Sequence, residues 1–127
     1  MSEFKNNYDL EERTAKFGEQ IIVFLKGLKR DAISTPLVSQ LVRSASSVGA
    51  NYMEANGASS PKDFTNKIFI CKKEAQETKH WLRMLQSCFP EHGDQIKIFW
   101  NEAQEFTLIF NKICSTMKIK NSLKIEK

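Results

Sequence analysis

The fold is decided by residues 41–85, which read LVRSASSVGANYMEANGASSPKDFTNKIFICKKEAQETKHWLRML. Apolar residues recur at alternating steps of three and four on both sides of the break Gly57–Pro61, and this spacing is typical of amphipathic helices. Each half also interrupts its apolar stripe with charged residues, which are Arg43, Glu54, Glu74 and Glu77. The pattern predicts a helical hairpin that has a polar network between its two helices.

The same periodicity occurs in four segments of the chain. We expect helices at about residues 10–30, 36–56, 61–89 and 95–119. Because the connections between them are short, consecutive helices should run antiparallel. The predicted fold class is therefore all-α, an up-down-up-down antiparallel four-helix bundle. The length of 127 residues suits one domain, residues 1–127, with a basic C-terminal tail after the last helix.

The limits of these helices are predicted from residues that favour helix ends. Asp9, Thr35, Ser60 and Asp94 are expected to be N-caps, because their side chains can accept hydrogen bonds from the first free backbone N–H groups. Proline follows two of these positions and suits the first helical residue. We expect Gly57 to end the second helix in the left-handed conformation that glycine adopts without strain.

The register of the hairpin follows from its turn. Residues equally distant from a point between Ala58 and Ser59 lie level, because both helices rise about 1.5 Å per residue. Arg43 then faces Glu74, and we expect an ion pair between them, because a buried carboxylate without a partner would be costly. Asn51 lies level with Asn66, and Glu54 lies level with Asp63, near Lys62 and Lys67. The predicted structural polar network comprises Arg43, Asn51, Glu54, Glu74 and Glu77.

The helices carry more apolar surface than one core requires. The third helix has a second row that reads Ile70, Glu74, Glu77, Trp81, Met84 and Cys88, and the first helix adds Ile22 and Leu25. Surplus apolar surface is typical of an interface, so we interpret Ile70, Trp81 and Met84, with Trp100 as their neighbour, as a candidate oligomer interface. The alternative is a wide core face.

The net charge is concentrated at the C-terminal end. From Asn111 onward five lysines stand against Glu126 alone, whereas the other 14 basic and 14 acidic side chains cancel, so this end holds the whole net charge of +4. Lysines that replace counterions bind nucleic acid without reading its sequence. The candidate nucleic-acid contacts are therefore Lys112, Lys118, Lys120 and Lys124. The alternative is a solubilising tail whose cations favour the helix C-terminus.

The sequence offers little that would support catalysis or metal binding. Glu77 and His80 have the Glu-x-x-His spacing of di-iron bundles, but no second copy of this motif occurs. Glu102 and Glu105 flank the apolar stripe and are expected to face solvent. The three cysteines lack metal-type spacing and are expected to be buried free thiols. We therefore expect neither an enzyme nor a bound metal or cofactor.

The chain should be cytoplasmic. Its first residues lack the basic region and apolar run of a leader, and no stretch approaches the roughly 20 apolar residues of a membrane span. We expect no membrane contact. Basic residues are not interleaved with aromatic ones along the chain, so sequence-specific recognition of nucleic acid has no support.

Three motifs carry a resemblance to a known family. They are Arg43-Ser44-Ala45-x-Ser47-Val48-x-Ala50-Asn51-x-x-Glu54, Lys62-Asp63-Phe64 and Lys73-Glu74-Ala75-x-Glu77-Thr78-x-x-Trp81-Leu82. In these residues, and in order and length over nearly the whole chain, the sequence resembles the four-helix-bundle proteins, also called 23S ribosomal RNA intervening-sequence proteins. It departs from them after Glu54, where members usually have glycine and this chain has Ala55-Asn56-Gly57.

The resemblance implies a bacterial four-helix bundle that assembles as a homopentamer, with no settled biochemical activity. It also implies a gene that is sometimes lodged in an insertion within ribosomal RNA genes. Bundles similar in fold serve as accessory variability determinant proteins of diversity-generating retroelements, where the pentamer binds nucleic acid and a reverse transcriptase. The location of a gene is no mechanism, so the family name is weak support for RNA binding.

Two functions are compatible with these observations. The first is a non-enzymatic oligomeric bundle that binds RNA or DNA non-specifically through basic residues, so that weak contacts add by avidity. The second is a protein-interaction scaffold that presents helical surface to another protein and makes no contact with nucleic acid.

Overall fold

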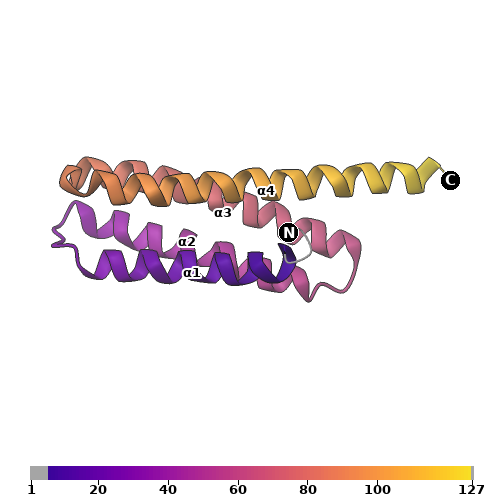
Figure 1. The fold of residues 1–127 in the computed structure, drawn as a ribbon, viewed down its shortest axis with the longest axis horizontal. Coiled ribbons are helices and arrows are strands. Elements are labelled where there is room, and N and C mark those ends of the chain that lie inside the picture. The colour runs from indigo at the N-terminus through magenta and orange to yellow at the C-terminus, as the bar shows by residue number, and fades with distance from the viewer. Residues whose placement is uncertain (1–5, 127) are drawn as a thin grey trace.

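The structure is a computed structural model that describes residues 6–126, without the side chains of residues 6–9, 121–122 and 124–126. Its helices are α1 (Asn6–Lys26), α2 (Ser34–Asn56), α3 (Pro61–Cys88) and α4 (Gly93–Glu126), and a short 3-10 helix, η2 (Pro90–His92), joins α3 to α4. Consecutive helices run in opposite directions (Figure 1), and no described residue forms a strand. The predicted all-α antiparallel four-helix bundle is confirmed.

The core is built from one apolar stripe of each helix, as the periodicity predicts. The largest fully buried apolar side chains are Phe17, Ile21, Leu41, Val48, Tyr52, Ile68, Leu82, Leu85, Ile96, Phe106 and Phe110. Between α1 and α4 the filling is aromatic: the ring of Phe17 meets Phe106 edge to face at 5.3 Å between centroids. Edge-to-face pairs add to the stabilisation that burial provides.

Helices α1 and α2 approach each other closely at a glycine. A Cβ atom added at Gly49 would lie 3.3 Å from the carbonyl carbon of Thr14, which is tighter than ordinary van der Waals contact. Because glycine has no side chain, the two backbones can meet here. The contact lets α1 pack directly on α2.

The connection between α1 and α2 differs from the prediction. Helix α1 ends at Lys26 rather than at residue 30, and its last turn is closed by a bond from the N–H of Gly27 to the carbonyl of Phe24. Helix α2 begins at Ser34, without a cap from Thr35. Instead, Asp31 accepts hydrogen bonds from the N–H groups of Ile33 and Ser34, while the Ser34 hydroxyl accepts from the N–H of Asp31. The backbone bond from Ser34 lowers the pKa of Asp31.

Three other predicted helix ends are corrected, and one is confirmed. Asp9 lies within α1 and Asp94 lies in the first turn of α4, because both helices begin earlier than expected. Gly57 has φ −100°, which is not left-handed, since its N–H reaches the carbonyl of Glu54 in an ordinary tight turn. Ser60 is the predicted N-cap, and its hydroxyl accepts from the N–H of Asp63 at 3.0 Å.

The expected basic tail is part of a helix. Helix α4 continues to Glu126 rather than ending at residue 119, and no glycine or proline interrupts it after Gly93. Figure 1 shows this end of α4 projecting beyond the other three helices. The lysines near the C-terminal end are therefore held on a helical scaffold.

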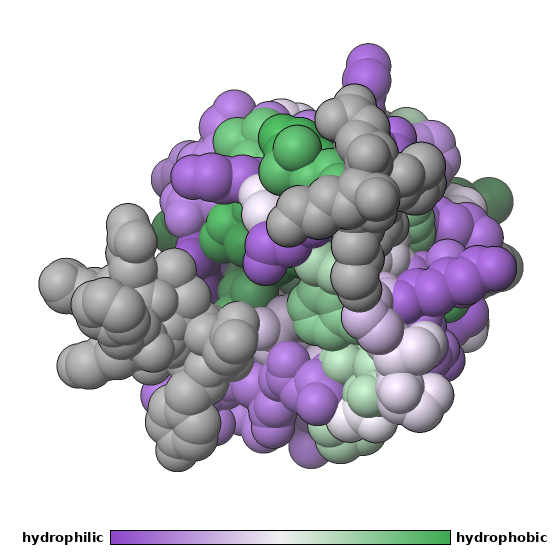
Figure 2. Space-filling view, turned by 90° about the vertical axis from the view of Figure 1, so that its right-hand side faces the viewer, coloured by the Kyte–Doolittle hydropathy of each residue, from purple (hydrophilic) through white to green (hydrophobic). Residues whose placement is uncertain are grey.

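Both hydrophilic and hydrophobic residues reach the surface of the bundle (Figure 2). Figure 2 views the bundle from the end where α4 projects, and hydrophobic residues reach the surface there only in separate patches. Over all faces of the described structure, the exposed large apolar side chains are those of Ile22, Val23, Ile33, Met53, Phe69, Ile70, Ile98, Leu108, Ile119 and Leu123. Within residues 6–126, every helix is too short or too polar to span a lipid bilayer.

Candidate interaction surfaces

The polar network on the α2–α3 seam centres on Arg43. Its Nη1 lies 3.2 Å from Glu74 Oε1, and its Nη2 donates to Glu77. The predicted ion pair between Arg43 and Glu74 is thus confirmed. Below it, the hydroxyl of Thr78 donates to the hydroxyl of Ser44 at 3.0 Å. The α2–α3 seam therefore contains ion pairs near its surface and a hydrogen-bonded pair of hydroxyls in its buried part.

Solvent reaches one side of this network. The side chain of Arg43 is 47% exposed, whereas that of Glu74 is only 11% exposed. Partial desolvation lowers the pKa of Arg43, but the attraction of Glu74 and the bond to Glu77 outweigh it, so the net shift is upward. Arg43, which is half exposed to water, binds the nearly buried carboxylate of Glu74. Replacing Arg43 should therefore destabilise the protein mainly by leaving the charge of Glu74 without a partner.

The remaining predicted members of the network lie apart from Arg43. Glu54 accepts from Lys67 Nζ at 2.8 Å, one turn beyond the level position of Asp63. Asn51 donates to the carbonyl of Ser47 within its own helix at 2.8 Å, rather than reaching across to Asn66. The predicted set of five residues is therefore one cluster of three, one separate ion pair and one local hydrogen bond.

A second network, which sequence reasoning missed, joins α1 to α4. Arg13 Nε lies 2.7 Å and Nη2 2.8 Å from the two carboxylate oxygens of Glu102, and Nη2 also donates to Glu105 at 2.6 Å. The hydrogen bond to Glu102 raises the pKa of Arg13 above its ordinary value. The guanidinium also lies over the ring of Phe106. Glu105 faces solvent as expected, whereas Glu102 is partly buried because the fold brings Arg13 to it.

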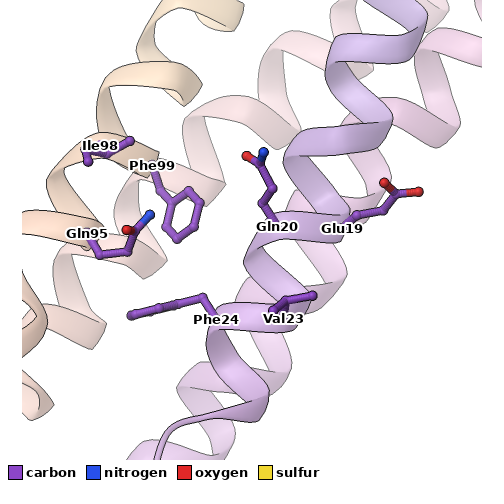
Figure 3. Close-up of a pocket in the computed structure, with 7 residues that line it drawn as sticks. All are labelled: Glu19, Gln20, Val23, Phe24, Gln95, Ile98 and Phe99. Atoms are coloured by element: carbon purple, nitrogen blue, oxygen red, sulfur yellow. The ribbon is translucent and has the colours of Figure 1, made fainter.

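A groove opens beside this α1–α4 seam. It has a volume of about 730 Å³ and is lined by Glu19, Gln20, Val23, Phe24, Gln95, Ile98 and Phe99. Figure 3 shows Phe24 and Phe99 projecting toward one another from α1 and α4, and their rings meet edge to face at 5.5 Å. Among the described lining residues, Glu19 alone is ionisable. The groove therefore offers no paired acid and base.

Two of the three thiols are unsuited to nucleophilic chemistry, whereas Cys88 is partly exposed rather than buried as expected. The sulfur of Cys71 is buried on the α2–α3 seam, 3.7 Å from the carbonyl of Val48, and burial raises its pKa to about 12. Burial also raises the pKa of Cys114. Because the thiolate is the reactive form, both thiols are poor nucleophiles near neutral pH.

The Glu-x-x-His motif does not form a site. Glu77 bonds to Arg43, whereas the ring of His80 packs against Trp81 at 4.8 Å. Among the described residues, no three His, Cys, Asp or Glu side chains gather where they could hold a metal ion. The motif is therefore divided between two different environments.

The candidate oligomer interface is divided by the fold. Trp81 lies on the same side of α3 as Glu74 and Glu77, which face α2, because the three residues are spaced by about one helical turn. Ile70 is 37% exposed, and Trp81 and Met84 are half-buried. Within the described residues, the buried indole N–H of Trp81 makes no hydrogen bond.

Two residues predicted to belong to the surplus surface lie elsewhere. Lys79 Nζ and Lys97 Nζ lie over the ring of Trp100, at 5.2 Å and 5.5 Å from its centroid. Because Lys79 faces α4, Trp100 is on the opposite side of α3 from Trp81 and is not its neighbour. Leu25 is buried in the core, whereas Ile22 is exposed.

The lysines of the C-terminal end do not form a single stripe. Lys112, Lys118 and Lys120 are exposed, and the side chain of Lys124 lies outside the described residues. With about 100° between successive residues, Lys112 and Lys120 share a side of α4, while Lys118 points about 160° away from Lys120. Lys118 Nζ lies 6.0 Å from the ring centroid of Phe69 on α3.

The fold and these surfaces define a four-helix-bundle protein. Residues 6–112 match the family described as 23S rRNA-intervening sequence protein, and the chain belongs to this family. It is similar to the crystal structure of a protein of unknown function from the S23 ribosomal protein family of Bacteroides thetaiotaomicron VPI-5482. The two share 29% sequence identity with a TM-score of 0.78, over 87% of this chain and 98% of that one. No curated protein matches the chain.

The family match divides the predicted residues. It includes the polar network around Arg43 and the candidate interface around Trp81, but it ends at Lys112. Lys118, Lys120 and Lys124 lie beyond the matched region. Neither the family description nor that of the related structure names a reaction.

Proposed function

We propose that the chain assembles with copies of itself, as the homopentamer that the family resemblance implies, and binds nucleic acid without sequence specificity and without catalysing a reaction. The observation that carries this proposal is the net charge of +4 from Asn111 onward, since four of the five lysines behind it lie on α4. A cytoplasmic location suits such a role. The proposal concerns binding alone.

The exposed lysines of α4 support an electrostatic contact. Lys112, Lys118 and Lys120 are exposed, and none of the ion pairs found among the described residues involves them. A lysine that is free of carboxylates can replace a counterion of a phosphate backbone. Their different directions on α4 suit a sequence-independent contact better than docking of a rigid groove.

Assembly would strengthen such weak contacts. Ile70, Trp81 and Met84 supply apolar surface on the α2–α3 side of the bundle. Copies joined through this side would present several lysine-rich ends together, and linked weak sites bind more tightly than separate ones. Trp81→Glu should therefore weaken assembly more than it unfolds the bundle, because aromatic residues dominate interface energetics.

The test compares the full chain with a chain truncated after Met117. Binding to duplex and single-stranded DNA and RNA is measured across a salt series, with the mass of each protein determined by light scattering. Each lysine that meets a phosphate should contribute about 0.9 to the slope of log affinity against log salt on duplex and about 0.7 on single strands. The truncated chain should stay folded and lose affinity and slope for every sequence alike.

A charge-only variant separates lysines from apolar residues. Truncation also removes the exposed side chains of Ile119 and Leu123. Replacing Lys118, Lys120 and Lys124 by glutamine keeps both, and it should reproduce most of the loss. If truncated and full chains bind equally, the lysines of this end are not the contact. If light scattering at micromolar concentration gives the mass of one chain, 14.6 kDa, the proposed self-assembly is wrong.

The second candidate function is a protein-interaction scaffold. It is favoured by the exposed side chain of Ile70 and the half-buried side chains of Trp81 and Met84, which could pack against another protein. A stable oligomer that binds no nucleic acid at low salt would support the scaffold over the proposed function.

A further inference from the structure

We propose that the α3–α4 face is a binding site for single-stranded nucleic acid, where Phe69 and Trp100 stack on bases and four lysines contact phosphates. The lysines are Lys72, Lys79, Lys97 and Lys118, and the six residues together are called the basic strip. This inference rests on the proposed nucleic-acid binding and adds both the kind of strand and a site distinct from most of the C-terminal lysines.

Contacts between α3 and α4 place all six residues on one face. Lys72 Nζ donates to Asn111 Oδ1 at 3.0 Å, and Lys79 Nζ donates to Gln104 Oε1 at 2.6 Å. Farther along the same two helices, Lys118 lies over the ring of Phe69. Lys79 and Lys97 lie beside the ring of Trp100. Each aromatic ring of the strip therefore has lysine beside it.

The strip is long enough for several nucleotides. Trp100 and Lys118 belong to the same uninterrupted helix, and their separation in sequence corresponds to a rise of about 27 Å. Phe69 is 42% exposed, and Trp100 is half-buried. Lys118 lies 6.0 Å from the Phe69 centroid, at the outer limit of cation–π attraction, so a base can compete with it for the ring.

Five carboxylates of α3 and α4 have their partners away from the strip. On α3, Glu74 and Glu77 bond to Arg43 of α2, and Asp63 accepts from the N–H of Ser59. On α4, Glu102 and Glu105 bond to Arg13 of α1. These acids cancel the basic residues in a count along the chain, but they do so on other faces. The α3–α4 face consequently keeps a positive charge that the sequence total conceals.

Stacking rings beside lysines favour a single strand over a duplex. In a duplex the bases are already stacked and turned inward, so exposed aromatic side chains gain little from them. In a single strand each base has a free face, and stacking on an aromatic ring is sequence-tolerant. Among the large apolar side chains exposed in the described part of the chain, Phe69 alone is aromatic.

The experiment compares two single strands of equal length, oligothymidine and a strand of abasic sites that keeps the phosphates but lacks the bases. The full chain should bind oligothymidine on the order of tenfold more tightly than the abasic strand, since stacking on one ring is worth about 1–3 kcal/mol per base. Phe69→Leu removes one of the two stacking rings, so it should clearly lower this preference while leaving the affinity for the abasic strand unchanged. Phe69 is exposed, so the variant should fold, which circular dichroism checks.

The lysines are tested separately from the rings. Replacing both Lys72 and Lys79 by glutamine should weaken binding to both strands alike and lower the salt slope by about 1.4, because each phosphate contact contributes about 0.7 on a single strand. The matched control replaces Lys16 and Lys26, which are exposed on α1 and form no ion pair with another residue that the structure describes. The control has the same charge change and should bind like the full chain.

Failure of this inference differs from failure of the proposed function. If the full chain binds no nucleic acid, both fall. If it binds but Phe69→Leu keeps the preference for bases, or if the lysine pair and its control behave alike, the strip is not the site and the proposed function stands. Tighter binding of duplex than of single strand, or equal competition by polyglutamate, would show a general cationic surface and overturn the assignment.

Discussion

The α2–α3 and α1–α4 seams each contain an arginine that holds two glutamates one helical turn apart, yet the two seams are built differently. Arg43 meets Glu74 across 31 residues of sequence that include a short turn. Arg13 meets Glu102 across 89 residues and two other helices. The turn sets the register of α2 against α3 directly, whereas the register of α1 against α4 depends on how the whole bundle packs.

What lies beneath each arginine follows from this difference. Under Arg43 the seam is tight and polar, with the Ser44 and Thr78 hydroxyls bonded in the interior. Under Arg13 it is wide and aromatic, with Phe106 below and an apolar groove alongside. Matched buried hydrogen bonds need a defined register, because a misplaced polar group would be left unsatisfied. Aromatic rings fill a wider space and tolerate small shifts.

The largest expected effect comes from emptying the aromatic seam. Phe17→Ala removes the ring that meets Phe99 and Phe106, and we expect a loss of about 3–5 kcal/mol in the free energy of unfolding. Urea denaturation measures this loss. Val23→Ala, at a position 71% exposed on the same helix, is the control and should change stability by less than about 0.5 kcal/mol. A loss below about 1 kcal/mol for Phe17→Ala would show that α1 and α4 do not depend on ring packing.

An intermediate effect compares the two arginines. Arg43→Met leaves the nearly buried Glu74 beside Glu77, and we expect a loss of about 1–2 kcal/mol, reduced from that of a fully buried pair because Arg43 is half in water. Arg13→Met leaves Glu102 and Glu105, which can turn toward solvent, so its loss should be about 1 kcal/mol or less. Urea midpoints at low salt and at 1 M salt measure both. A larger loss of stability for Arg13→Met than for Arg43→Met would contradict our assignment of the α2–α3 seam as the tighter one.

The smallest expected effect is a difference in thiol reactivity, with no change in stability. Burial raises the pKa of Cys71 to about 12, so a disulfide reagent at pH 8 should modify the partly exposed Cys88 first. The rate at Cys71 should rise about tenfold per pH unit, because only the thiolate reacts. The pKa of Cys71 is higher in the folded protein than in the unfolded chain, so the neutral thiol stabilises the fold below the ordinary pKa of cysteine. This contribution is lost as the pH rises toward 12.

Arg43→Met should accelerate labelling of Cys71, since both residues belong to the α2–α3 seam, whereas Arg13→Met should leave the rate unchanged. Equal acceleration by both variants would mean that the two seams open together. Mass spectrometry of digested protein identifies which thiol is modified at each time.

Prediction from sequence succeeded where the chain itself carries the information. The ion pair of Arg43 and Glu74 followed from counting residues on both sides of one turn, because two helices that share a short connection cannot slide independently. Ser60 was identified as an N-cap because capping involves residues only a few positions apart. The same local reasoning missed Asp31, whose reciprocal bonds with Ser34 start α2 earlier than Thr35 would.

Prediction failed where distant segments meet. No spacing along the chain links Arg13 to Glu102 and Glu105, so the second network could not be predicted. Trp100 was grouped with Trp81 because both are surplus aromatic residues, but Lys79 and Lys97 hold it on the other side of α3. The charge count along the sequence placed the whole net positive charge from Asn111 onward. The fold also places lysines and glutamates, which cancel in that count, on different faces of α3 and α4.

The sequence by itself determined four amphipathic helices, their antiparallel order and the register of the central hairpin, because these depend on periodicity and on a turn of a few residues. It also determined where the net charge lies along the chain. Only the tertiary structure decided which faces became wide or tight, which glutamates were neutralised and which aromatic residues came to lie beside lysines. These properties depend on contacts between residues far apart in sequence, and close packing of the whole bundle settles those contacts together.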